Sequence, residues 1–75
     1  MTNNDVLKRL RYVFDYSTNK MIEISNLAEQ NTNNDFMGAW LLQEDEEGYE
    51  ECSDRDLAVF LNGLIIEKRG RKDGP

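Results

Sequence analysis

The fold of this chain is decided by residues 53–70, which read SDRDLAVFLNGLIIEKRG. Ser53 is a favourable helix N-cap, and Asp56 follows three residues later, where a capping box has its acidic or amide side chain. Two bases in the last turn suit the negative end of the helix dipole, and Gly70 is a typical stop. The stretch predicts one amphipathic helix, whose apolar stripe comprises Leu57, Phe60, Leu61, Leu64 and Ile65.

Three further helices are predicted upstream, at about residues 4–16, 19–30 and 34–46. Each carries apolar residues at spacings of three and four, the pattern of a helix with one buried face. The residues expected to cap the first two are Asn3 or Asn4 and Ser17 or Thr18. The sequence therefore predicts an all-α fold: a compact, antiparallel-like bundle of four short helices.

Length and composition exclude several classes of protein. Seventy-five residues make one domain at most, and a domain of this size buries only about 60% of its unfolded surface. The longest apolar runs are four residues, whereas a membrane span needs roughly 20. The N-terminus lacks the basic and apolar regions of a signal peptide. The single cysteine forms no internal disulfide, so we expect a cytoplasmic protein.

The chain contains no histidine. This removes serine–histidine–aspartate triads, cysteine–histidine pairs and the usual zinc sites. Consecutive acids on an exposed surface do not make an acid–base pair, which needs two carboxyls in different environments within a cleft. We therefore expect no enzyme, no cofactor and no metal site.

Charge is unevenly distributed along the chain. Residues 44–56 hold eight acids and one base, whereas residues 68–75 hold four bases and one acid. The net charge of −6 opposes nucleic-acid binding, because phosphate neutralisation supplies most of that affinity. The alternative is a nucleic-acid-associated regulatory domain with a helix-turn-helix, in which the basic side chains of Lys8, Arg9 and Arg11 contact the nucleic acid. A gel shift at low salt tests this alternative.

The acidic segment partly matches a calcium-binding loop. Asp45 and Gly48 fit the loop pattern, but Gln43 replaces the first acid, Glu47 the third, and Asp54 the bidentate glutamate. A solvated acidic turn ahead of the last helix is the favoured interpretation.

Three other conspicuous residues and one repeated motif have structural interpretations. Cys52 has acidic neighbours that disfavour a thiolate, so a packed cysteine is expected. Trp40 shares a helix face with other apolar residues and is expected in the core. Gly63 costs about 1 kcal/mol relative to alanine in a helix, and its expected use is the close approach of another helix. Thr2–Asp5 and Thr32–Asp35 repeat the sequence TNND, either as shared N-caps, which we favour, or as a remnant of duplication.

Arg9, Tyr12 and Tyr16 form a separate ridge at spacings of three and four, away from the apolar stripe of the first helix. Arginine and tyrosine are enriched at protein interfaces, so these three residues are the candidate partner-binding site. The equally open alternative is that the rings lie over a neighbouring helix.

Several motifs together resemble the YehS-like family of small bacterial proteins, a domain of unknown function. They are Trp40-Leu41, Glu44–Gly48, Cys52, Asp54, Phe60–Ile65 and Glu67–Gly70, with the opening Asn4–Leu7 and Leu10–Tyr12. The resemblance covers residues 3–70 and implies members about twice this length, with two related helical copies. This chain resembles the first copy, which fits either a truncated two-copy protein or a single-copy member. The family supplies no catalytic residue, cofactor or substrate.

These observations predict a helical domain at residues 1–70 and a polar linker or tail at residues 71–75. The predicted function is a non-catalytic interaction domain of a cytoplasmic bacterial protein. Its expected partner is a protein, either in a homo-oligomer or as a second copy of the domain, and neither nucleic acid nor membrane. The alternative is the nucleic-acid-associated regulatory domain described above.

Overall fold

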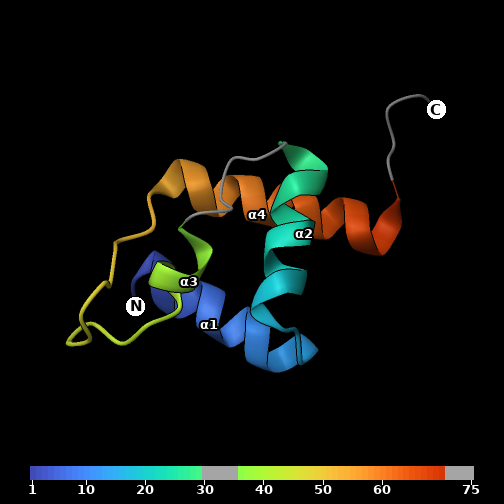
Figure 1. Cartoon of the computed structure of the whole chain (residues 1–75). Helices are drawn as coiled ribbons and strands as arrows, with labels where there is room; N and C mark the ends of the chain where they lie inside the picture. The colour runs from blue at the N-terminus through green and yellow to red at the C-terminus, as the bar shows by residue number, and fades with distance from the viewer. Residues whose placement is uncertain (30–35, 71–75) are drawn as a thin grey trace.

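The computed structural model describes residues 1–29 and 36–70, which form four helices (Figure 1). In chain order they are α1 (Asn3–Phe14), α2 (Thr18–Ala28), α3 (Met37–Trp40) and α4 (Asp54–Arg69). The described residues contain no strand, so the predicted all-α bundle of four short helices is confirmed. Within the same residues, no helix is both long enough and apolar enough to cross a bilayer. The predicted tail at 71–75 lies outside the described ranges.

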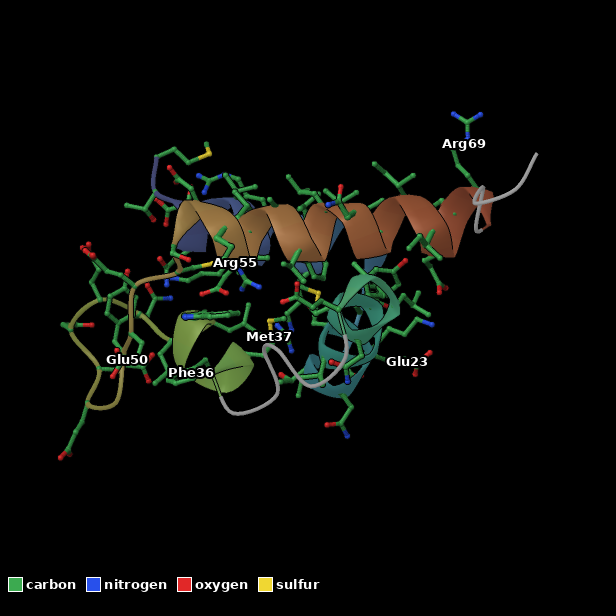
Figure 2. All side chains as sticks on the ribbon, turned by 90° about the horizontal axis from the view of Figure 1, so that it is seen from above. Glu23, Phe36, Met37, Glu50, Arg55 and Arg69 are labelled. Carbon is green, nitrogen blue, oxygen red and sulfur yellow. The ribbon has the colours of Figure 1, made fainter. Side chains whose placement is uncertain are left out.

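The helices form two layers. α1 and α4 lie one above the other in Figure 1, and Figure 2 shows α2 and α3 together on one side of them. α2 crosses α4 steeply (Figure 1). In this respect the arrangement differs from the predicted antiparallel-like bundle, in which neighbouring helices run alongside each other. Gly63 lies at this crossing, because a Cβ atom built there would be 1.9 Å from the carbonyl oxygen of Ile24. The predicted use of Gly63, the close approach of a second helix, is confirmed.

α1 begins one residue earlier than predicted, with Thr2 as its N-cap. The Asp5 backbone N–H donates to the Thr2 hydroxyl (3.1 Å), and the Thr2 N–H donates to the Asp5 carboxylate (3.0 Å). This reciprocal capping box satisfies two N–H groups at once. The expectation that Asn3 or Asn4 caps the helix is therefore wrong, because both lie inside the first turn.

The caps of α2 and α4 follow the sequence closely. The Ser17 hydroxyl accepts from the Lys20 N–H, and the Ser53 hydroxyl accepts from the Asp56 N–H, both at 3.1 Å. The Asp56 carboxylate also accepts from the Ser53 hydroxyl at 3.0 Å. Gly70, at φ 81°, ends α4 with its N–H bonded to the carbonyl of residue 66. The predicted start and stop of the last helix are both confirmed.

α3 is much shorter than the predicted helix at 34–46. It ends at Trp40, and residues 43–49 form successive turns instead, with Gly48 at φ 94°. Four consecutive acids at 44–47 would repel one another and oppose the negative C-terminal end of a longer helix. The chain then turns back, and the Glu50 N–H donates to the Ala39 carbonyl (3.5 Å). Residues 34 and 35, and the second TNND motif, lie outside the described ranges.

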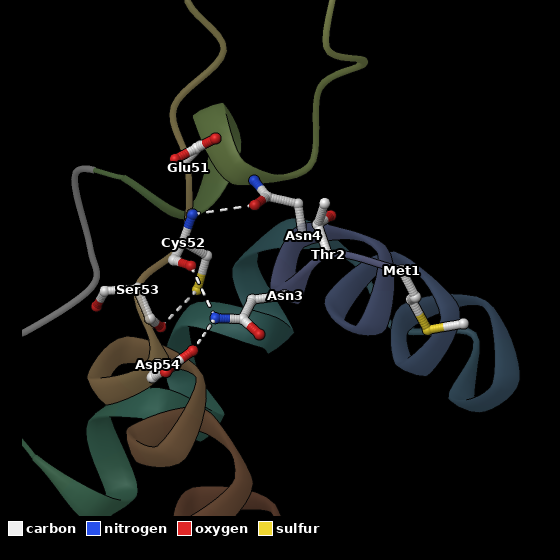
Figure 3. A pocket seen from close by; sticks show the side chains of 8 residues that line it. All are labelled: Met1, Thr2, Asn3, Asn4, Glu51, Cys52, Ser53 and Asp54. Atoms are coloured by element: carbon white, nitrogen blue, oxygen red, sulfur yellow. Dashed lines mark hydrogen bonds between the residues drawn. The ribbon is translucent and has the colours of Figure 1, made fainter.

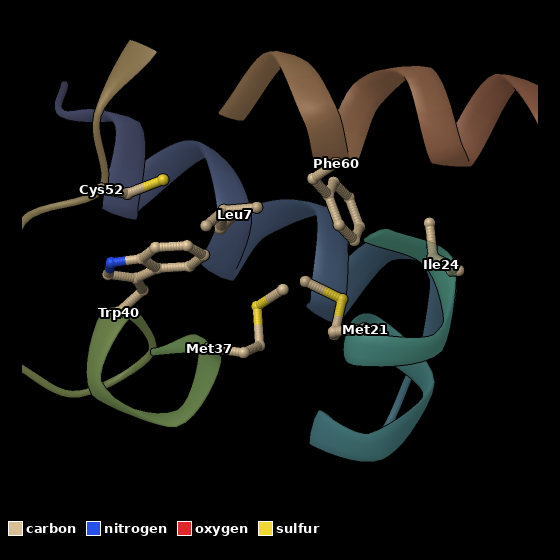
Figure 4. Close-up of a cluster of buried hydrophobic side chains, with 7 residues drawn as sticks. All are labelled: Leu7, Met21, Ile24, Met37, Trp40, Cys52 and Phe60. Carbon is tan, nitrogen blue, oxygen red and sulfur yellow. The ribbon is translucent and has the colours of Figure 1, made fainter. Parts of the chain in front are cut away.

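The core lies between the two layers (Figure 4). Trp40 is only 2% exposed, so its predicted place in the core is confirmed. Two residues of the apolar stripe predicted for the last helix are exposed instead, Leu61 (37%) and Ile65 (54%), and Val13 on α1 is 71% exposed. α4 has neighbours on only part of its circumference, which leaves the rest of its wide apolar stripe in solvent. The buried apolar cluster comprises Leu7, Met21, Ile24, Met37, Trp40, Cys52 and Phe60.

Candidate functional site

The structure separates the three residues predicted to bind a partner. Tyr12 is 88% exposed on α1, and Arg9 is exposed with its guanidinium donating to the Asp5 carbonyl at 3.4 Å. Tyr16 follows Asp15, which has a left-handed backbone at φ 57°, and its ring packs against the core cluster. Arg9 and Tyr12 therefore offer an outer surface, whereas Tyr16 fits the alternative interpretation of a ring lying over a neighbouring helix.

Tyr16 joins the C-terminal ends of α1 and α4. Its ring stacks on Phe14 at 5.2 Å between centroids, and the Lys68 ammonium lies 4.8 Å from the Phe14 centroid and 5.8 Å from that of Tyr16. Aromatic pairs and cation–π contacts of this geometry stabilise the surfaces they join. The Tyr16 hydroxyl is buried, and it has no hydrogen-bond partner among the described residues.

A surface pocket lies where the N-terminus meets the segment before α4 (Figure 3). Asn4 is 2% exposed and uses its whole side-chain amide there. Its Nδ2 donates to the carbonyls of Trp40 (3.1 Å) and Glu50 (2.8 Å), and its Oδ1 accepts from the Cys52 N–H (3.0 Å). One side chain of α1 thereby fixes both the end of α3 and the segment that leads into α4.

Asn3 continues this contact toward α4. Its Nδ2 donates to the Cys52 carbonyl at 3.0 Å and to the Asp54 carboxylate at 2.7 Å. In the wall of the pocket, Asn4 is thus bonded to the Cys52 N–H, and Asn3 to the Cys52 carbonyl and Asp54 (Figure 3). This arrangement explains the pocket as a structural junction between α1 and α4.

Cys52 lies in this junction as a packed residue, 5% exposed, as the sequence predicts. Burial, followed by the negative charges of Asp56 and Asp54, raises the pKa of the Cys52 thiol to about 12. Its Sγ donates to the Ser53 carbonyl at 3.6 Å. The thiol is therefore protonated near neutral pH, which is the unreactive state of a cysteine.

The acidic segment 44–51 is largely exposed. One of its carboxylates is used locally, because Glu46 accepts from the Gln43 N–H at 2.7 Å. In the described part of the chain, no three acidic or cysteine side chains come together as metal ligands would. The calcium-loop hypothesis therefore gains no geometric support from these residues.

One of the three bases that suggested nucleic-acid binding, Lys8, lies among carboxylates. Lys8 lines a surface hollow together with the carboxylates of Asp5, Glu44 and Asp45. A phosphate approaching Lys8 would meet these three negative charges, which oppose it. Nucleic-acid association remains an alternative hypothesis, which the gel shift tests.

The comparisons with known proteins agree with the resemblance in the sequence. The family described as "Protein of unknown function (DUF1456)" matches residues 3–70, which is nearly the whole chain. The chain belongs to this family. A curated relative, the uncharacterized protein YehS of Escherichia coli (strain K12), is 40% identical over 73 residues. The match covers 97% of this chain and 47% of the relative, so the chain spans about half the length of that relative. No solved structure matches the chain.

Two features of this DUF1456 domain escaped sequence reasoning. The sequence alone suggests Asn4 as a candidate cap. Asn4 lies three residues before the buried Leu7 and therefore on the inward side of α1, and this spacing is the sequence signal for a polar residue in the core. The exposure of Leu61 and Ile65 was also missed. The sequence signal for this exposure is the width of the apolar stripe of α4, because the short neighbouring helices cover only part of so wide a stripe.

Proposed function

We propose that this DUF1456 domain is a non-catalytic interaction domain that docks with a second copy of itself. The observation that carries the proposal is the exposure of two branched apolar side chains on α4, Leu61 and Ile65. Exposed apolar residues that gather on one surface are typical of protein–protein contacts, whereas single ones need no explanation. Leu61 and Ile65 are four residues apart on α4, so they lie on one face of the helix.

The chemistry of the side chains supports a role without catalysis. The chain has no histidine to serve as a general base, and its single thiol is buried and protonated. The carboxylates of the acidic segment are mostly exposed to water and lack the contrasting environments that acid–base pairs need.

The net charge of −6 and the position of Lys8 among carboxylates further favour a protein partner over a nucleic acid. A protein surface of mixed charge does not need the basic face that phosphate binding requires.

Sedimentation equilibrium at protein concentrations from about 10 µM to about 1 mM tests the proposal, because small interfaces give weak complexes. We expect the average mass to rise with concentration toward that of a dimer. A strictly monomeric chain over this whole range, with no binding to an immobilised second copy, would overturn the proposed function.

A further inference from the structure

The outer face of α4 carries an ordered pattern of charge and apolar side chains. Asp54, Ala58, Leu61 and Ile65 follow one another at spacings of four, three and four, so they lie on one side of the helix. Lys68 and Arg69 continue the same line by three and four residues. All six residues are exposed. This stripe, called here the α4 outer stripe, is acidic at its start, apolar in its middle and basic at its end.

The apolar middle of the α4 outer stripe points away from α2, whereas at its two ends Asp54 accepts from Asn3 and the Lys68 ammonium lies over the Phe14 ring. Gly63 marks the side of α4 that touches α2, and Val59, four residues before it, is buried on the same side. Figure 2 shows Arg69 extending from the end of α4 away from α2 and α3, whereas Arg55 lies on the side of α3. Leu61, Ile65 and Arg69 can therefore meet another molecule without displacing a helix of this domain, and Asp54 uses only its Oδ1 in the contact with Asn3.

Resting on the proposed function, we infer that the second copy docks through its own α4, antiparallel to this one, about a two-fold axis between Leu61 and Asn62. A two-fold interface requires a surface that is complementary to itself. The α4 outer stripe meets this condition, since residues 54 and 69 are equally far from its midpoint, about 11 Å at 1.5 Å per residue. Antiparallel pairing therefore places the Asp54 carboxylate of each copy beside the Arg69 guanidinium of the other.

The apolar middle of the stripe is matched in the same register. Pairing about this axis sets Ala58 of one copy opposite Ile65 of the other, so that a small side chain faces a large one. The two Leu61 side chains meet near the axis itself. Parallel pairing would instead bring like charges together at both ends, and like-charge contacts disfavour such a complex.

The length of α4 sets the strength of the contact. Sixteen residues extend about 24 Å, so a single helix face buries less than a standard interface of about 800 Å² per partner. The dimer is therefore weak, with a dissociation constant on the order of 0.1 mM.

Cysteine cross-linking in the intact chain tests the register. Leu61→Cys places a thiol near its own counterpart across the axis, and a disulfide needs Cβ atoms about 4 Å apart. Buried Cys52 remains in place, because its thiol is protonated and enclosed. The matched control is Glu23→Cys, at an exposed position on α2 far from the stripe (Figure 2). We expect rapid disulfide-linked dimer from Leu61→Cys under mild oxidation and only slow, random coupling from Glu23→Cys. Equal rates for the two would overturn the inference.

Sedimentation of three surface variants separates this inference from the proposed function. Ile65→Gln should weaken dimerisation about tenfold, and Arg69→Glu about threefold at low salt with less effect at high salt. Tyr12→Ala on α1 should leave the dimer unchanged. If dimers persist in Ile65→Gln and Arg69→Glu, or are lost in Tyr12→Ala alone, the α4 interface is wrong while self-association still holds. If the native chain is monomeric throughout, both proposals fail.

Discussion

Substitution of Gly63 by alanine tests how closely α2 and α4 pack. A Cβ atom at this position would lie 1.9 Å from the Ile24 carbonyl oxygen and 2.8 Å from its carbonyl carbon, both backbone atoms that no rotamer change moves. Real Cβ atoms keep at least 3.0 Å from other heavy atoms, so the crossing must open by about 1 Å. Because α2 and α4 share the core, this opening also loosens the contacts of Ile24 and Phe60.

The magnitude is the difference between two opposing effects. Overpacking a core costs about 1–3 kcal/mol, and a clash with backbone lies at the upper end of that range. Alanine recovers about 1 kcal/mol over glycine through its helix propensity. We therefore expect Gly63→Ala to lower the free energy of unfolding by about 2 kcal/mol. For a domain of this size, that loss lowers Tm by about 8–16 °C.

Thermal and urea unfolding followed by far-ultraviolet circular dichroism measures this effect. Gly38→Ala is the matched control, because Gly38 lies in α3, its backbone φ is not positive, and nothing lies within 4 Å of an added Cβ. The control should be as stable as the native chain or gain up to about 1 kcal/mol. If Gly63→Ala is as stable as Gly38→Ala, the close crossing of α2 and α4 is refuted.

Three further substitutions test the junction between the N-terminus and α4. Asn4→Ala removes three hydrogen bonds and leaves buried backbone groups unpaired, so urea unfolding should show that the free energy of unfolding falls by about 2–4 kcal/mol. Asn3→Ala, at a half-buried position, should lower it by only about 1 kcal/mol. Equal losses in the two variants would contradict this account. Cys52, whose pKa is raised to about 12, should resist iodoacetamide at pH 8.5 in the native state and react once urea unfolds the chain; rapid native alkylation would show that the thiol is accessible. The hydrogen bond from the Thr2 N–H is the main cause that lowers the pKa of Asp5 in the folded chain. The Asp5 carboxylate therefore stabilises the fold above its ordinary pKa of 3.8, and this stabilisation is lost as the pH falls through its lower pKa in the folded state. Asp5→Asn should flatten the acid limb of the stability profile, and an unchanged limb would contradict the cap.

The elements that the sequence predicted well are those specified by nearby residues. Ser53 and Gly70 bound α4 through contacts within one turn, which is why both were identified correctly. Gly63 was also interpreted correctly, because glycine inside a strong helix lowers its stability unless a neighbour needs the space. Local chemistry of this kind is visible in any single sequence.

The errors concern features that depend on distant parts of the chain. Whether Leu61 and Ile65 are covered depends on how many helices lie beside α4, and an apolar stripe predicts only that one side is buried. The early end of α3 reflects the acids at 44–47 and also the hydrogen bond from Asn4 to the Trp40 carbonyl, which joins residues 36 positions apart. Sequence spacing carries no information about such contacts.

The candidate site shows the same division. The position of Arg9 and Tyr12 on the outer surface of α1 followed from helical periodicity. The inward position of Tyr16 did not, because it depends on the left-handed turn at Asp15 that follows α1. A short polar residue at a helix end is compatible with several backbone conformations, so the direction of the next side chain was undetermined.

The hydrogen bond from the Cys52 N–H to Asn4 joins residues 48 positions apart and so closes most of the described chain into a ring. Small secreted domains commonly achieve such closure with a disulfide, because a short chain buries too little surface to restrain itself. Here a single amide does so without covalent chemistry. The closure forms without an oxidant and opens reversibly whenever the first turn of α1 unwinds, so the N-terminal turn and the start of α4 should exchange their amide hydrogens as one cooperative unit.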